Sequence, residues 1–116
     1  MLEKRKFIRL GAAIGVSYKV IKTHKRQKEA LSLVKDIGGG GIRVIAKEDL
    51  RHGDLVDLKI QVPHLSEPLE AIGEVVWFSK AKDGDHEHRE AGVRFRDIHP
   101  NDLHKILEYV HTIGIG

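Results

Sequence analysis

The sequence predicts a mostly β fold, in which an antiparallel sheet or barrel carries one packed helix. Two observations support this prediction. Apolar residues alternate with polar ones over several short runs, and their period changes to that of a helix only near the carboxyl end. The chain has 116 residues, 41% hydrophobic and 32% charged, and no repeat or linker divides it. These values are typical of one folded domain.

Six segments have the pattern of strands. In residues 14–20 apolar side chains alternate with small or polar ones, as they do in a half-buried strand. Comparable patterns predict strands over residues 30–36, 42–45, 55–62, 69–79 and 91–95. Turn residues separate these strands. The connecting segments are residues 23–28, His52-Gly53-Asp54, and a polar hairpin loop over residues 82–88 with Asp83-Gly84 at its centre.

One helix is predicted near the carboxyl end. Apolar residues recur there at helical spacing, namely Leu103, Ile106, Leu107, Val110 and Ile113. Pro100 suits the first turn, and Asp102 is favourable at the positive end of the helix dipole. Gly114 can end the helix.

The composition argues against several functions. Cysteine is absent, which excludes disulfides and thiolate zinc sites. The amino end is basic but has no apolar segment long enough for a signal peptide or a membrane span, so we expect a cytoplasmic protein without membrane insertion. His86 and His88 lie in a polar loop, and His-x-His alone does not indicate a metal site. No hydrolase elbow motif or carboxylate pair in a cleft is evident, so we expect no enzyme.

Residues 35–44, KDIGGGGIRV, contain four consecutive glycines in front of a predicted strand. A glycine inside a regular element costs about 0.5–1 kcal/mol relative to alanine, so the run needs a reason. Phosphate-binding loops and dinucleotide fingerprints both need a helix after the glycines, whereas a strand follows here. Two interpretations remain. One is a tight turn with positive φ at one or two positions, and the other is a bare strand corner against which a flat ligand lies.

Positive charge gathers near the amino end, although the net charge is only +3. Within EKRKFIRL, Arg5 and Arg9 form an Arg-x-x-x-Arg pattern. A guanidinium group binds phosphate, or the O6/N7 edge of guanine, through two hydrogen bonds, which lysine cannot do. By itself this pattern is a weak signal, because arginine pairs are common in basic chains.

Arg-x-x-x-Arg followed by an Asp-x-Ser-x-x-Gly-like segment resembles the PilZ domain family, which are receptors for the bacterial second messenger cyclic di-GMP. The second segment is residues 36–41, DIGGGG, in which Gly38 stands where the family has serine. Further along, GEVVWFSK resembles a late barrel strand, AGVRFRDI the final strand and HPNDLHKILEYV the closing helix. The resemblance covers nearly the whole chain. It implies a six-stranded antiparallel β-barrel with a C-terminal α-helix.

The resemblance also implies a cyclic di-GMP site and a two-part organisation. Residues 1–10 would form a mobile basic arm, and residues 11–116 a single barrel domain with its helix. Arg5 and Arg9 would contact phosphate and guanine edges, and Asp36 would accept hydrogen bonds from guanine N1 and N2. The other candidate contacts are Gly38 and Gly41 from the motif and, as secondary candidates, Lys4, Gly39, Gly40 and Trp77.

Three of these residues leave alternatives open. For Trp77, burial in the core is favoured over stacking on the ligand, because its neighbours in VVWF are apolar. Gly38 lacks the serine hydroxyl, which removes about 0.5–1.5 kcal/mol of hydrogen bonding, or up to about 3 kcal/mol with a charged partner. Lys4 occupies a position that in the family influences whether one ligand or an intercalated pair binds, and lysine there leaves the number open.

We therefore expect a receptor or adaptor that orders its arm on binding cyclic di-GMP and presents a changed surface to an unidentified downstream protein. Such domains serve motility, exopolysaccharide production or surface attachment. The alternative is a degenerate PilZ domain that binds a protein without nucleotide, which Gly38 favours. A basic barrel that binds single-stranded nucleic acid is disfavoured, because one Trp, two Tyr and three Phe are not interleaved with the basic clusters.

Overall fold

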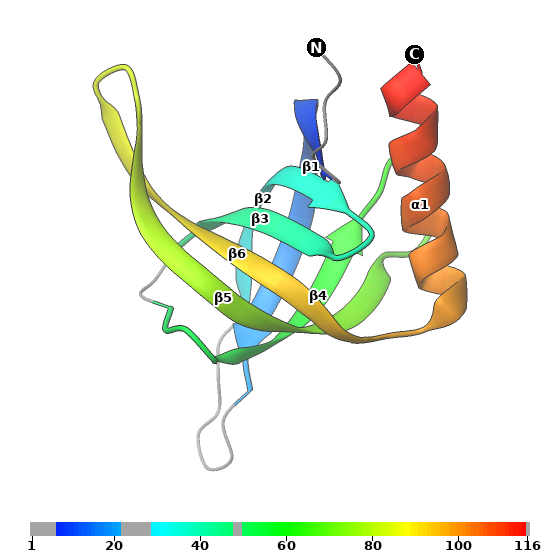
Figure 1. Cartoon of the computed structure of the whole chain (residues 1–116), viewed down its shortest axis with the longest axis horizontal. Helices are drawn as coiled ribbons and strands as arrows, with labels where there is room; N and C mark the ends of the chain where they lie inside the picture. The colour runs from blue at the N-terminus through cyan, green and yellow to red at the C-terminus, as the bar shows by residue number, and fades with distance from the viewer. Residues whose placement is uncertain (1–6, 22–28, 48–49, 116) are drawn as a thin grey trace.

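The computed structural model describes residues 7–21, 29–47 and 50–115. Within them, six antiparallel strands close into a barrel in the order β1-β2-β3-β6-β5-β4, and one helix follows (Figure 1). The elements are β1 (Phe7–Val20), β2 (Ala30–Gly38), β3 (Gly41–Ala46), β4 (Leu55–Gln61), β5 (Leu69–Asp83), β6 (His86–Ile98) and α1 (Pro100–Ile115). The predicted six-stranded antiparallel barrel with a C-terminal helix is confirmed. The predicted turn over residues 23–28 lies outside the described residues.

The barrel interior is built from the alternating apolar residues that the sequence pattern identified. Ile14 and Tyr18 of β1 and Leu58 of β4 are almost fully buried. Tyr18 extends across the interior, and its hydroxyl accepts a hydrogen bond from the Lys47 amide at 2.9 Å. This bond satisfies the one polar atom of a buried phenol, as burial of tyrosine requires.

Helix α1 packs against the barrel beside the turn between β2 and β3 (Figure 1). Within the helix, Ile106 is fully buried, whereas Leu107 is 48% exposed. The start of the helix is tied to β5, because the Asp102 carboxylate accepts a hydrogen bond from the Glu70 amide at 3.3 Å. The helix continues through Gly114 to Ile115, so Gly114 does not end it as predicted. In the part of the chain that the structure describes, no helix is long and apolar enough to cross a membrane.

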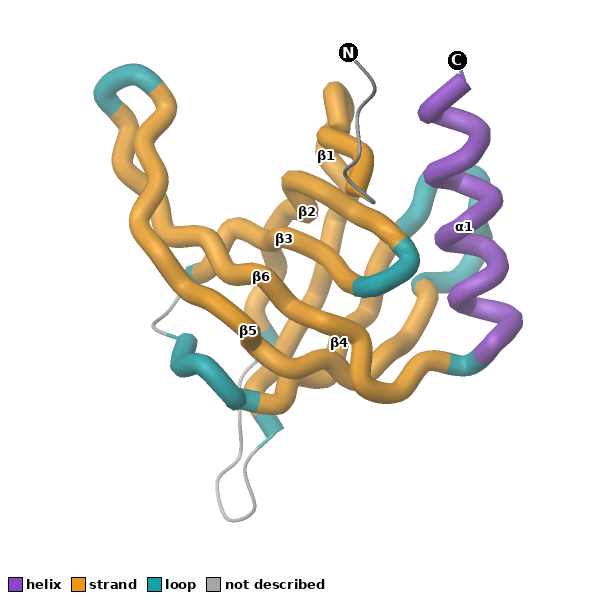
Figure 2. The backbone as a smooth tube through the Cα atoms, in the orientation of Figure 1, coloured by secondary structure: helices purple, strands orange, loops and turns teal. Residues whose placement is uncertain are grey.

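The hairpin between β5 and β6 extends beyond the barrel (Figure 2). Residues 82–88 were expected to form a loop, but strand pairing continues to Asp83 and His86, and only Gly84 and Asp85 turn. Gly84 has a φ of 60°, which suits the first position of a two-residue hairpin turn. The tight turn needs only two residues, so the polar residues on either side of it pair as strands.

The glycine run forms the turn between β2 and β3. Gly38 and Gly41 are paired at its base, and residues 39–40 make the turn. Among the described residues, positive φ occurs at Gly53, Gly84 and His64, so the interpretation that relied on positive φ in this run is wrong.

Close backbone approach explains the glycine at position 41. A Cβ on Gly41 would overlap the carbonyl oxygen of Val93 in β6. On Gly39, a Cβ would lie 2.9 Å from Cδ2 of Leu107 in α1. The Gly40 carbonyl accepts a hydrogen bond from the Phe95 amide at 2.9 Å. The turn is therefore pressed between β6 and the helix, and neighbours occupy the space of a side chain at Gly39 and Gly41 but not at Gly40.

We expect Gly41→Ala to lower the free energy of unfolding by at least about 1–3 kcal/mol, the range for overpacking a filled interior, because backbone rather than a movable side chain blocks the new methyl group. Urea denaturation measures this change. Gly40→Ala is the matched control. Nothing lies within 4 Å of a Cβ there, so a change within about 0.5 kcal/mol is expected. Equal losses in the two variants would contradict this account.

Candidate ligand-binding site

One row of paired residues crosses five strands of the barrel. The pairings along it are Arg9–Asp36, Asp36–Arg43, Arg43–Gly92 and Gly92–Trp77. From Asp36 to Trp77 the row lies on the outer face, because the residues beside it along each strand, such as Ile37 and Val93, are buried in the core. The register therefore places the backbone of Arg9 opposite Asp36, as a site shared by these two residues requires.

Residues 7–10 of the predicted arm belong to β1, whereas Lys4 and Arg5 lie outside the described residues. Pairing of β1 with β2 is regular from Phe7 to Arg9, and the register then shifts before Ile14. The mobility of the arm over residues 1–10 stays a prediction.

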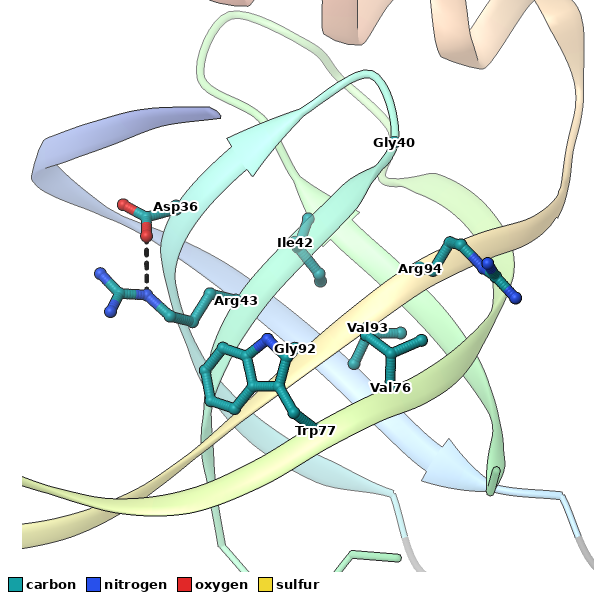
Figure 3. Close-up of a pocket in the computed structure, with 9 residues that line it drawn as sticks. All are labelled: Asp36, Gly40, Ile42, Arg43, Val76, Trp77, Gly92, Val93 and Arg94. Carbon is teal, nitrogen blue, oxygen red and sulfur yellow. Dashed lines mark ion pairs between the residues drawn. The ribbon is translucent and has the colours of Figure 1, made fainter. Parts of the chain in front are cut away.

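A pocket of about 400 Å³ opens on the outer face along this row (Figure 3). The charged and aromatic side chains that line it are those of Asp36, Arg43, Trp77 and Arg94. Gly40 and Gly92 also line it, and there is open space beside Gly40. An indole, a guanidinium group such as that of Arg94 and a carboxylate are groups that would hold a charged, planar, aromatic ligand.

Two charged groups of the pocket, Asp36 and Arg43, are linked to each other and to the buried Glu90. Arg43 Nε lies 2.7 Å from Asp36 Oδ2, but it is not aligned for a hydrogen bond, so the attraction is ionic (Figure 3). Arg43 Nη1 donates to Oε1 of the buried Glu90 at 3.1 Å. His88 Nε2 lies 2.5 Å from the second oxygen of Glu90. Among the described residues Asp36 Oδ1 is buried without a hydrogen-bond partner. Such an orphan acceptor in a native structure calls for an explanation.

Trp77 is not buried in the core, contrary to the favoured sequence interpretation. It is 40% exposed and lines the pocket. The register of β5 against β6 shifts between Val75 and Trp77, so Val76 is an extra residue in β5. One extra residue inverts the inward and outward alternation. Val75 therefore points into the barrel, and Trp77 lies outside it.

The indole of Trp77 lies over Gly92, where a Cβ would overlap its Nε1, Cε2 and Cδ1 atoms. Gly92 is thus the second glycine, with Gly41, whose missing side chain shapes this face. An aromatic ring that covers a glycine on the neighbouring strand also protects the bare backbone beneath it.

Sequence reasoning missed Arg43, Glu90 and Arg94. Alternation in residues 41–46, GIRVIA, would have placed Arg43 on the outer face. Its partners could not be found in this way, because Glu90 is 47 residues away along the chain and only the register brings it near. Among the described residues no group of three or more His, Asp or Glu side chains could hold a metal ion.

We expect Gly92→Ala to displace the indole of Trp77 and to shift its fluorescence emission to longer wavelength, because the new methyl group takes the place of the ring. Trp77 is the only tryptophan, so emission reports this site directly. Gly15→Ala is the control, since a Cβ on this strand glycine would lie 4.0 Å from Gln61 Cβ in ordinary contact. An unchanged spectrum for Gly92→Ala would show that the ring does not depend on this glycine.

Comparison with known proteins gives consistent matches. The fold resembles Bacillus subtilis Inhibitor of motility (MotI/DgrA), with a TM-score of 0.75 and 20% identity over 98% of this chain and 53% of that chain. It resembles the PilZ domain of Escherichia coli YcgR with c-di-GMP, with a TM-score of 0.71 and 14% identity over 97% and 93%. It also resembles the K. pneumonia MrkH–c-di-GMP complex, with a TM-score of 0.72 and 17% identity over 98% of this chain and 54% of that chain.

The chain spans about half the length of the Bacillus and Klebsiella proteins, and identities this low show the fold alone. A search of curated proteins found no match. The sequence profile of the PilZ domain matches residues 3–112. Because this match covers nearly the whole chain, the protein belongs to the PilZ domain family, a family of non-catalytic cyclic di-GMP receptors.

Proposed function

We propose that this chain binds cyclic di-GMP on the outer face of β2, β3, β6 and β5, at the pocket beside Asp36. The observation that carries the proposal is the Asp36 carboxylate itself. One of its oxygens has no hydrogen-bond partner in the described chain, and its backbone is paired with that of Arg9. Guanine N1 and N2 are donors, and an aspartate oxygen is the acceptor they need.

The remaining contacts follow from the chemistry of the ligand. Its two phosphates carry two negative charges, and Arg5 and Arg9 supply guanidinium groups that bind phosphate or the guanine O6/N7 edge. The exposed indole of Trp77 offers a face on which a base stacks, worth about 1–3 kcal/mol per base. Gly40 leaves open space at the turn, so the ligand can approach the backbone closely. Gly38, Gly39 and Gly41 would contribute backbone only, and Lys4 a further positive charge.

Binding would order the arm, residues 1–10, across the barrel face. The ordering costs about 1–2 kcal/mol of backbone entropy per residue fixed, which charged hydrogen bonds to the ligand must exceed. The ordered arm would present a changed surface to a downstream protein, in the cytoplasm. Control of motility or attachment is the output we propose, and one protein with a similar fold is the Bacillus subtilis Inhibitor of motility.

Titration calorimetry with cyclic di-GMP tests the proposal. We expect saturable binding that weakens as salt is added, because the ligand is anionic. Arg9→Ala should weaken it about a hundredfold or more, since a charged, bidentate partner is lost. Arg96→Ala is the charge-matched control, because Arg96 pairs with Glu74 at 3.0 Å and does not line the pocket. No binding by the unmodified chain at high micromolar ligand would favour the degenerate adaptor that Gly38 suggests.

Gly38→Ser restores the hydroxyl that the family has at this position. We expect affinity for cyclic di-GMP to rise, by no more than about two decades, the range of one hydrogen bond to a charged group. Gly38→Ala controls for the added Cβ and should bring no gain. If serine and alanine have the same effect, the hydroxyl has no part in binding.

A further inference from the structure

Arg43 connects two carboxylates beside the pocket, although it lies outside both sequence motifs of the site. Its Nε is 2.7 Å from Asp36 Oδ2, and its Nη1 is 3.1 Å from Glu90 Oε1. All three side chains are largely shielded from water, with exposures of 25% for Arg43, 15% for Asp36 and 7% for Glu90. One guanidinium therefore serves both acids at once.

The register explains why Arg43 reaches Glu90. The residue directly opposite Arg43 in β6 is Gly92, which has no side chain, and the indole of Trp77 covers it. Arg43 is left with the diagonal neighbour two residues away on β6, which is Glu90. A buried carboxylate must be paired, and His88 at 2.5 Å holds its other oxygen. Glu90 is thus a fixed anchor, and it fixes Arg43 in turn.

Arg43 acts on Asp36 in two ways. The Arg43 guanidinium lies beside Oδ2 of Asp36, whereas Oδ1 of Asp36 points away from Arg43 and has no hydrogen-bond partner among the described residues (Figure 3). It also offsets negative charge. Without it, two shielded carboxylates would lie close to a ligand that carries two negative charges, at a separation where the interior screens poorly. Because Oδ1 is buried, a guanine reaches it only after neighbouring groups move, so the carboxylate must be held in place during that movement.

Resting on the function proposed above, we propose that Arg43, anchored by Glu90, is a positioning residue for cyclic di-GMP. It holds the Asp36 carboxylate so that Oδ1 accepts from a guanine, and it offsets the charge of the two acids. It acts through Asp36 and does not itself bind the ligand.

A double-mutant cycle on Asp36 and Arg43, measured by calorimetry with cyclic di-GMP, tests this. Arg43→Gln alone should weaken affinity about tenfold. In an Asp36→Asn background the same change should have less than about a threefold effect, because the carboxylate that Arg43 positions is gone. Losses that simply add would overturn the proposal, since they would indicate that Arg43 contacts the ligand directly. Arg96→Gln removes the same charge from β6 outside the pocket and should change affinity less than about twofold.

Glu90→Ala tests the proposal by whether affinity for cyclic di-GMP rises or falls. Removal of a negative charge near an anionic ligand would by electrostatics alone tighten binding. If Glu90 anchors Arg43, binding instead weakens, by about three- to tenfold. Tighter or unchanged binding by a variant that still unfolds cooperatively would overturn the proposal. Arg43→Lys keeps the charge but cannot contact both carboxylates as the guanidinium group does, so it should also weaken binding, though less than Arg43→Gln, and it replaces the glutamine variant if that variant does not fold.

The two proposals fail differently. Absence of binding by the unmodified chain would remove the proposed function and this inference together. Binding that is lost with Arg9→Ala but unaffected by Arg43→Gln would leave the proposed function in place and remove only the role of Arg43.

Discussion

The close approach of β3 to β6 is the constraint on which the outer face depends. At Gly41 the strand lies so near the Val93 carbonyl that no side chain fits. This contact starts a ladder in which Arg43 pairs with Gly92 and Ile45 with Glu90. A slip of one residue would send Arg43 into the barrel and Ile42 to solvent, because side chains alternate with a period of two. The pocket exists only in this register.

The structural reason for a glycine differs between the positions in the site. Gly41 permits contact between two backbones, whereas Gly92 makes room for the indole of Trp77 and leaves Arg43 without a direct neighbour. Gly40 faces open space. The run of four glycines is therefore no uniform flexible segment. It joins positions where side chains are sterically excluded to a position where their absence leaves the surface bare.

The strands and the helix could be predicted because their signal is local. Period-two alternation in residues 14–20 and 55–62 matches the buried faces of β1 and β4, and the spacing of Ile106 and its neighbours matches α1. The expectation of a non-enzymatic chain is confirmed by the family. The length of the β5–β6 hairpin was underestimated, because charged residues in a two-stranded ribbon look like a loop when only composition is considered.

The site was only partly predictable, because some of its contacts join segments that are distant in the sequence and leave no local signal. Asp36 was found through a short motif, and its pairing with the Arg9 backbone follows from the strand register. Trp77 was placed wrongly, because a single extra residue at Val76 reverses the alternation and leaves no trace in local composition. Arg43 and Glu90 meet through two ladders between distant segments. The alternation of apolar and polar residues along one strand cannot predict such a contact.

Magnitudes favour the proposed receptor over a degenerate adaptor. The serine that Gly38 replaces is worth about 0.5–1.5 kcal/mol for a neutral hydrogen bond and up to about 3 kcal/mol with a charged partner, or roughly two- to hundredfold in affinity. Stacking on an exposed indole contributes about 1–3 kcal/mol, and Trp77 lies in the pocket with 40% of its surface accessible. The loss at Gly38 is therefore comparable to the contribution that we propose for Trp77, which the extra residue Val76 in β5 places on the outer face. If the proposed site is correct, one missing hydroxyl would lower affinity without removing the guanidinium, carboxylate and aromatic groups that we propose recognise the cyclic dinucleotide.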